Sequence, residues 1–166
     1  ELCAELNTFV PGRLLDDDGA MPIRYDGDAK GVLAASQTAA GEENAVKIRI
    51  HGTKGGLEWC QEEPNTMWMK WPDRPREMIR TSNGYMSEMA AHNSRTPGGH
   101  PEGYIEAFAN IYRNFALTLQ AMKEGKEPSS LCLDFPSVQE GVRGMQFIET
   151  VVASSNSDKK WVKMVD

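Results

Sequence analysis

The spacing of apolar residues changes part-way along this chain of 166 residues, and that change limits the fold classes open to it. In the segment 46–51, Val46, Ile48 and Ile50 alternate with charged or polar residues, which is the two-residue period of a strand with one wet face. In the second half, apolar residues recur every three or four positions, at Tyr104, Phe108, Ile111, Phe115, Leu119 and Met122. That spacing predicts one face of a helix. Strands followed by helices predict an α+β fold.

The strands expected in the first part are short and are separated by turn-forming residues such as Pro11-Gly12 and Asp26-Gly27. Consecutive strands joined by tight turns pair in the antiparallel direction. We expect strands over residues 2–7, 20–25, 31–39, 46–51, 57–62, 67–71 and 77–81, and residues 161–164 can return as an edge strand.

Two helices are expected after the strands. The first ends near Gly125, and the pattern Ser137-x-x-Glu140 is a capping box that predicts the start of the second. The expected fold is a predominantly antiparallel open sheet of five to seven strands, with two long helices packed through their apolar stripes on one face. The length and the absence of a long linker predict a single domain over residues 1–166.

The second face of this sheet has no helix to cover it. Because side chains alternate along a strand, two sets of residues lie on opposite faces of the sheet. One face has Trp68, Lys70, Cys60 and Glu58, and the other has Leu57, Trp59, Met67 and Met69. Large aromatic area in water favours association, so this open face is a candidate interface for a homo-oligomer. The alternative is a solvated sheet face with a few exposed apolar residues.

Composition excludes several classes of partner. The net charge is −6 at pH 7 without any block of Lys and Arg, so we expect no nucleic-acid binding. No segment approaches the roughly 20 apolar residues of a membrane-spanning helix, so we expect no membrane association. The three cysteines lack the spacing of metal ligands, which favours reduced thiols in a cytoplasmic protein.

Catalytic and cofactor motifs are missing from these residues. The sequence contains neither the Gly-x-Gly-x-x-Gly dinucleotide fingerprint nor a phosphate-binding loop, and no Gly-x-Ser-x-Gly elbow supports a hydrolase. The histidines form no metal-binding pair: His51 fits an exposed position, and His92 can join a site or face solvent. The run Asp16–Asp18 is interpreted as a solvated turn rather than a calcium loop.

The segment 95–108 places an arginine and a histidine on a glycine-rich loop before the first helix. Pro101 suits the first helical position, which puts His100 at or beside the helix cap. Free amide groups and the positive dipole end there favour a polar or anionic ligand atom and keep an imidazole neutral. A structural role, with His100 as a cap and Arg95 in solvent, fits these residues equally well.

Motifs spread in order over nearly the whole chain resemble one family. The matching segments are Glu5-x-Asn7-Thr8-Phe9-Val10-Pro11-Gly12-Arg13, Asp16-Asp17-Asp18-Gly19, Ala34-Ala35-Ser36-Gln37, Ala40-Gly41-Glu42-Glu43-Asn44, Gly52-x-x-Gly55-Gly56-Leu57-Glu58-Trp59, Gly99-His100-Pro101-Glu102-Gly103-Tyr104 and Asp134-Phe135-Pro136-Ser137. Together they resemble the C-terminal domain of the family of glucose-fructose oxidoreductase, inositol dehydrogenase and the rhizopine catabolism oxidoreductase.

This resemblance implies a two-domain enzyme. An N-terminal Rossmann domain would bind NAD or NADP, and the domain seen here would supply part of the substrate pocket and the oligomer interface. Hydride would pass between the nicotinamide and a carbon of a sugar or cyclitol. The family's catalytic lysine and its Asp-x-x-x-His motif have no counterpart in these residues, so we assign no catalytic residue and expect this chain alone to be inactive.

The resemblance also implies which residues form the wall of the substrate pocket. His100 and Arg95, and more weakly Arg13 and Tyr104, resemble family positions near the substrate, and their donors and acceptors suit sugar hydroxyls. For Arg13 and Tyr104, capping and surface solvation are equal alternatives. A rival hypothesis is a free-standing binding or scaffold module that associates with itself and has no catalytic activity. A dinucleotide fingerprint encoded directly upstream of Glu1 would favour the enzyme, and a start codon there would favour the module.

Overall fold

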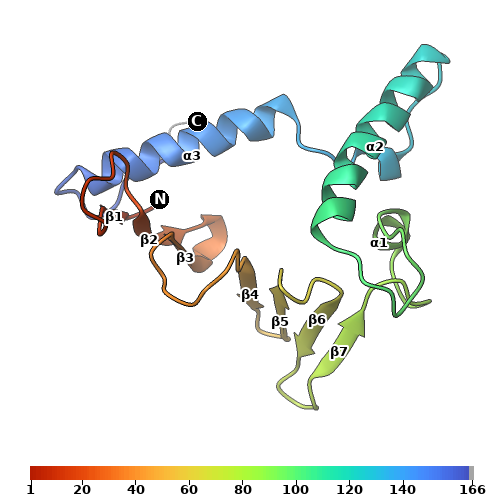
Figure 1. The fold of residues 1–166 in the computed structure, drawn as a ribbon, viewed down its shortest axis with the longest axis horizontal. Coiled ribbons are helices and arrows are strands. Elements are labelled where there is room, and N and C mark those ends of the chain that lie inside the picture. Colours follow the sequence, from red (N-terminus) through yellow and green to blue (C-terminus); the bar gives the residue numbers. More distant parts are fainter. Residues whose placement is uncertain (165–166) are drawn as a thin grey trace. The chain divides into compact units, whose positions relative to one another are not determined.

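The computed structural model describes residues 1–164, which form two compact units. One unit combines residues 1–41 with the segment from Pro136 onward, and the other consists of residues 42–135. Each contains an antiparallel sheet and a long helix (Figure 1). The second unit is therefore an insertion between two segments that fold together.

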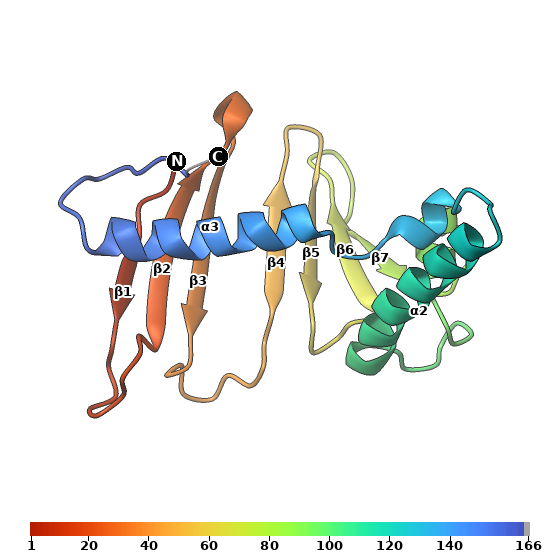
Figure 2. The same cartoon turned by 90° about the horizontal axis from the view of Figure 1, so that it is seen from above.

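The first unit is a three-stranded sheet crossed by one helix. Its strands β1 (Glu5–Asn7), β2 (Asp18–Arg24) and β3 (Lys30–Ser36) lie in the order β1-β2-β3, with the short helix η1 (Asp26–Asp28) between the last two. Helix α3 (Val138–Ser155) runs across these strands (Figure 2) and contacts β1. A small core of Leu2, Ala4, Met21 and Val151 lies between helix and sheet.

The end of α3 is tied to the first strand segment by hydrogen bonds as well as by apolar contact. The hydroxyl oxygen of Ser154 accepts a hydrogen bond from the Ala4 amide at 3.0 Å, and that of Ser155 accepts one from the Leu6 amide at 3.0 Å. Backbone amides on the edge of a sheet need such partners when they are covered. These serines therefore join the two segments of the first unit, which are far apart in sequence.

The second unit contains a four-stranded sheet followed by helices. The strands are β4 (Lys47–His51), β5 (Gly56–Cys60), β6 (Thr66–Lys70) and β7 (Glu77–Arg80), paired in that order. The helices are α1 (Glu88–His92), α2 (Tyr104–Lys123) and η2 (Ser130–Leu133). Short turns connect the strands, so every pairing in both sheets is antiparallel.

The register of the second sheet confirms the predicted division of side chains between its faces. Glu58 pairs with Trp68, and Trp68 pairs with Met78, so these three residues lie on one face. Leu57 pairs with Met69 on the opposite face. The guanidinium carbon of Arg76 lies 4.4 Å from the centre of the Trp68 ring, which adds a cation to the Trp68 face.

The long helices do not bury the apolar stripes that their spacing predicts. In α2 the stripe residues Tyr104 and Met122 are each 62% exposed, while the buried residues are Asn110, Asn114 and Thr118. In α3 the buried residues are Thr150, Val151 and Ser154. The prediction that the α2 stripe packs on the sheet is wrong for this chain, because α2 turns its polar side toward η2 and α1.

Most element boundaries agree with the sequence prediction. The α+β class, the antiparallel pairing, the seven strands and the two long helices are confirmed, and the strands are divided between two sheets. The capping box at Ser137 is present, with the Ser137 hydroxyl oxygen accepting from the Glu140 amide at 3.2 Å. The expected edge strand 161–164 is reduced to one bridge between Leu2 and Val162. The five-residue helix α1 was not predicted.

Candidate functional site

The loop between α1 and α2 is organised by the carboxylate of Glu102. Its oxygens accept hydrogen bonds from the Arg95 amide at 2.8 and 3.0 Å, from the Thr96 amide at 2.7 Å and from the Thr96 hydroxyl at 2.8 Å. The carboxylate thus closes the segment 95–102 into a ring. Sequence reasoning missed this role, because a single glutamate two residues after His100 gives no distinctive signal.

The hydrogen bonds in this loop also lower the pKa of Glu102. Burial alone would raise the pKa of the carboxyl, but the hydrogen bonds from Thr96 and Arg95, helped by the Arg95 charge, lower it below its ordinary value. Glu102 is therefore ionised at neutral pH and fixes the backbone that presents Arg95.

The prediction that Pro101 occupies the first helical position is wrong. Helix α2 begins at Tyr104, and its N-cap is Gly103, whose amide donates to the Glu106 carboxylate at 2.8 Å. Pro101 precedes the N-cap by two residues because Glu102 keeps the preceding chain in the closed loop. His100 is consequently not a helix cap, and the proposed effect of the helix dipole on its ring does not apply.

His100 is oriented by the loop backbone. Its Nδ1 lies 3.1 Å from the carbonyl oxygen of Pro97, and since a carbonyl can only accept, Nδ1 is the donor. In the neutral ring this leaves Nε2 as a hydrogen-bond acceptor. The ring is exposed, while the backbone carbonyl of His100 accepts from the Asn65 side chain at 2.9 Å. Asn65, in the turn between β5 and β6, thus anchors the loop to the second sheet.

Two glycines let the loop lie against its neighbours. A Cβ on Gly103 would stand 2.9 Å from Cγ of Pro64, and one on Gly98 would stand 3.0 Å from the carbonyl oxygen of Ser82. Both approaches are too close for a side chain to fit without a shift of the neighbour. The loop is therefore held by contacts on the segments around Pro64 and Ser82 as well as by Glu102.

Arg95 and His100 lie on this loop, Tyr104 is the first residue of α2 directly after it, and all three side chains are exposed. The Tyr104 ring stacks at a tilt on Phe108, with 4.9 Å between ring centres. We call Arg95, His100 and Tyr104 the loop triad. Its chemistry is that of hydrogen bonding: a guanidinium donor, an imidazole acceptor and a phenol that can do both.

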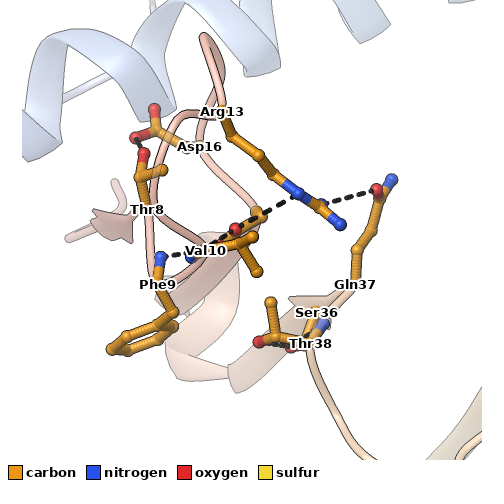
Figure 3. A network of polar contacts seen from close by, with 9 residues as sticks. Thr8, Phe9, Val10, Arg13, Asp16, Ser36, Gln37 and Thr38 are labelled. Atoms are coloured by element: carbon orange, nitrogen blue, oxygen red, sulfur yellow. Dashed lines mark hydrogen bonds and ion pairs between the residues drawn. The ribbon is translucent and has the colours of Figure 1, made fainter.

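Arg13, the fourth predicted residue, belongs to the other unit and lies on the loop between β1 and β2. Figure 3 shows its guanidinium reaching toward the side chain of Gln37. Nε lies 3.7 Å from the Asp17 carboxylate, and Nη1 donates to the Gln37 side chain at 3.4 Å. With 40% of its side chain exposed, Arg13 has donors left for an external group.

Asp17 is the buried anchor of this second loop. Its side chain is 1% exposed, and its two oxygens accept from the amides of Phe9 at 2.8 Å and Val10 at 3.0 Å. The Phe9 hydrogen bond above all, with further help from Val10 and Arg13, outweighs the effect of burial and lowers the pKa of Asp17. The interpretation of residues 16–18 as a solvated turn is therefore wrong for Asp17.

A polar cluster joins the end of α1 to α2. His92, at the end of α1, places Nε2 at 2.9 Å from the Asn114 side-chain oxygen and 3.0 Å from Nη1 of Arg113. Asn114 is fully buried and also donates to Asn93 at 2.9 Å. His92 thus belongs to the interior of this unit. The spacing of Asn110, Asn114 and Thr118, each four residues apart, was the sequence signal for this buried polar face.

Clusters of metal-ligating side chains and pairs of parallel strands are both absent from residues 1–164. Within residues 1–164, no group of three or more histidine, cysteine, aspartate or glutamate side chains is placed to hold a metal ion. Both sheets of this part are wholly antiparallel, whereas a dinucleotide fold needs parallel strands joined by a helix. In the same range, no helix is both long enough and apolar enough to cross a membrane.

Comparison with known proteins gives a consistent result. Residues 2–164 match the model of an oxidoreductase family, C-terminal alpha/beta domain. The chain is 30% identical over 164 residues to an uncharacterised oxidoreductase, YfiI, of Bacillus subtilis, covering 98% of this chain and 42% of the relative.

Two solved structures are similar over the same range. An oxidoreductase from Sinorhizobium meliloti is 41% identical, with a TM-score of 0.89 over 98% of this chain and 45% of that one. An inositol dehydrogenase homologue from Azotobacter vinelandii, solved with NADH and myo-inositol, is 31% identical, with a TM-score of 0.88 over 97% of this chain and 43% of that one. The chain thus spans less than half the length of these relatives.

Proposed function

Since this chain belongs to the oxidoreductase family of glucose-fructose oxidoreductase and inositol dehydrogenase, as its C-terminal alpha/beta domain, we propose that it forms the substrate-side wall of an NAD(P)-dependent dehydrogenase. The substrate we propose is a sugar, a sugar derivative or a cyclitol. The observation that most supports this proposal is the similarity, over 97% of this chain, to a homologue solved with both NADH and myo-inositol.

The loop triad provides the chemistry for recognising a polyol. Each hydroxyl of a polyol can donate and accept one or more hydrogen bonds. His100 would accept at Nε2, because Nδ1 is already used by Pro97. Arg95 would donate, and the Tyr104 hydroxyl would do either. Arg13 would contribute donors from the loop that Asp17 holds.

The nicotinamide cofactor does not fit the residues present. These residues contain no Gly-x-Gly-x-x-Gly turn, and both described sheets are antiparallel, so they offer no cradle for a pyrophosphate. We propose that NAD or NADP is held by an N-terminal Rossmann domain in the intact protein. The residues of this chain would bind and orient the substrate, and we assign none of them a step in hydride transfer.

The test uses this chain joined to the Rossmann half of its parent protein. Reduction of NAD⁺ or NADP⁺ is followed at increasing concentrations of myo-inositol and of several aldoses. We expect saturable oxidation of at least one of these polyols. The 166-residue chain without that half should neither oxidise them nor bind NADH saturably. Activity or NADH binding by the chain alone would contradict the proposal.

A histidine pair tests the role of the loop. His100→Gln should raise the KM for the polyol about tenfold, because the loss of a hydrogen bond of about 1.4 kcal/mol weakens binding by that factor. The KM for the cofactor should not change. His51→Gln, at another exposed histidine of the same unit, is the matched control and should leave both constants unchanged. Equal effects of the two variants would remove His100 from the substrate wall.

A further inference from the structure

Asn65, in the turn between β5 and β6, contacts both the end of β7 and the loop 95–102. Its carbonyl oxygen accepts a hydrogen bond at 3.1 Å from the amide of Thr81, the residue that follows β7. Its side-chain amide donates to the His100 carbonyl oxygen at 2.9 Å. One half-buried asparagine therefore joins the edge of the second sheet to the loop that contains His100.

The turn that contains Asn65 is itself fixed to the sheet. The amide of Thr66, the first residue of β6, donates to the Glu63 carbonyl oxygen at 3.0 Å. The indole N–H of Trp59, in β5, donates to the Pro64 carbonyl oxygen at 3.0 Å. Both neighbours of Asn65 in the chain are thus held by hydrogen bonds. The side chain of Asn65 therefore starts from a defined position.

The other hydrogen bonds of His100 lie inside its own loop. Its amide donates to the Pro97 carbonyl oxygen at 3.1 Å, and Nδ1 of its ring donates to the same oxygen at 3.1 Å. Among residues 1–164, Asn65 is the only residue outside this loop that forms a hydrogen bond with His100. The position of the imidazole relative to the sheet therefore depends on Asn65.

Arg95, on the same loop, is held by a different residue. Its amide donates to the two oxygens of the Glu102 carboxylate at 3.0 and 2.8 Å. Within residues 1–164, neither Arg95 nor Glu102 forms a hydrogen bond with Asn65. Interactions that share no partner usually add independently in free energy. A change at Asn65 should therefore displace His100 and leave Arg95 in place.

We propose that Asn65 is a positioning residue, which places the His100 imidazole against the polyol without contacting the substrate itself. This inference rests on the proposed function, in which Nε2 of His100 accepts a hydrogen bond from a substrate hydroxyl. The Asn65 amide can donate to the His100 carbonyl, whereas a carboxylate can only accept. Asn65→Ala therefore removes the hydrogen bond, and Asn65→Asp replaces it with a repulsion between two oxygens.

Hydrogen exchange tests the positioning in the absence of substrate. Exchange rates of single amides are measured in this chain joined to the Rossmann half of its parent protein. We expect Asn65→Ala to speed exchange at the His100 amide and to leave the Arg95 amide unchanged, because Glu102 still holds it. Asn44→Ala is the matched control, because Asn44 is exposed and only its backbone carbonyl accepts hydrogen bonds among residues 1–164. Unchanged exchange at His100 in Asn65→Ala would overturn the proposal.

Steady-state kinetics of the same joined protein test the consequence for the substrate. We expect the KM for the polyol to rise in Asn65→Ala and further in Asn65→Asp, up to about the tenfold that one lost hydrogen bond produces. The KM for the cofactor should not change, and Asn44→Asp should leave both constants unchanged. In a His100→Ala background, Asn65→Asp should have no further effect, because no imidazole remains to be positioned. In an Arg95→Met background it should raise the KM by the same factor as in the wild type.

The results distinguish this inference from the proposed function. If His100→Ala leaves the KM for the polyol unchanged, His100 is not in the substrate wall, and both proposals about it fail. If His100→Ala raises that KM and Asn65→Asp does not, the inference about Asn65 fails and the substrate wall stands. An equal rise from Asn65→Asp with and without the imidazole would show a general loosening of the loop and would also refute the inference.

Discussion

At the scale of single residues, two carboxylates decide how the candidate ligand-binding side chains are presented. Glu102 closes the loop that contains Arg95 and His100, and Asp17 holds the loop that contains Arg13. Both act on backbone amides, where a charged acceptor forms stronger hydrogen bonds than a neutral one. The positions of Arg95 and Arg13 therefore depend on two acids whose anchoring role the sequence did not indicate.

Asp17→Asn tests this anchoring. Asparagine keeps the size of the side chain but removes the negative charge of the carboxylate. That carboxylate accepts hydrogen bonds from the amides of Phe9 and Val10 and forms an ion pair with Arg13. We expect the midpoint of thermal unfolding to fall by several degrees. Asp16→Asn is the matched control, because Asp16 is exposed and accepts one longer bond of 3.3 Å from Thr8. Equal midpoints for the two variants would show that Asp17 is not the anchor.

The same pair of variants has a defined pH dependence. The pKa of Asp17 is lower in the folded chain than in the unfolded one, where an aspartate titrates near about 3.9. Its contribution to stability is therefore complete above that value and is lost as the pH falls through the lower, folded pKa. Below pH 4 the wild type should lose stability more steeply than Asp17→Asn, as followed by denaturant unfolding at each pH. Parallel pH profiles would contradict the lowered pKa.

At the scale of elements, the buried face of a helix depends on its neighbour. Helix α2 has an apolar stripe by spacing, but its buried side bonds to polar groups: Asn114 to Asn93, and the Thr118 hydroxyl to the Cys132 carbonyl at 3.0 Å. Buried amides and hydroxyls are tolerated when each has a partner, and α1 and η2 provide those partners. Apolar periodicity predicted the helix correctly and its packed side incorrectly.

Helix α3 gives the test at this scale, because its start is local in sequence. Ser137→Ala removes the hydroxyl that accepts from the Glu140 amide, and N-cap losses of this kind cost about 1 kcal/mol. We expect the free energy of unfolding from urea denaturation to fall by about that amount. Ser137→Asp retains an acceptor at the N-cap and should remain near the wild type. If the alanine variant matches the wild type, the capping box does not stabilise this helix.

At the scale of the whole molecule, the open face of the second sheet is the surface that we propose joins subunits. Trp68 and Met78 lie side by side on this face, and Met78 is 51% exposed. Large apolar side chains in water favour association when they lie beside one another. Charged neighbours such as Arg76 and Glu58 would then set the register between copies.

Sedimentation of the chain and of two matched variants tests this surface. We expect the wild type to self-associate as its concentration increases. Met78→Glu should shift it toward the monomer, because the change buries a charge in the proposed contact. Ile50→Glu places the same charge at an equally exposed residue, also 51%, on the opposite face, and should leave association intact. A wild type that stays monomeric throughout would refute the proposed interface.

The sequence by itself determined the features that depend on near neighbours along the chain. Alternation at Ile48 and Ile50, the cap at Ser137 and the three-to-four spacing after Tyr104 located most elements to within a few residues, and the ordered motifs identified the family. Tertiary structure alone decided which of three successive aspartates turns inward, which side of α2 is buried and where α2 begins. Those outcomes depend on contacts between segments that are distant in sequence, such as Asp17 with Gln37 and Asn65 with His100. A local sequence pattern cannot predict the energies of such contacts.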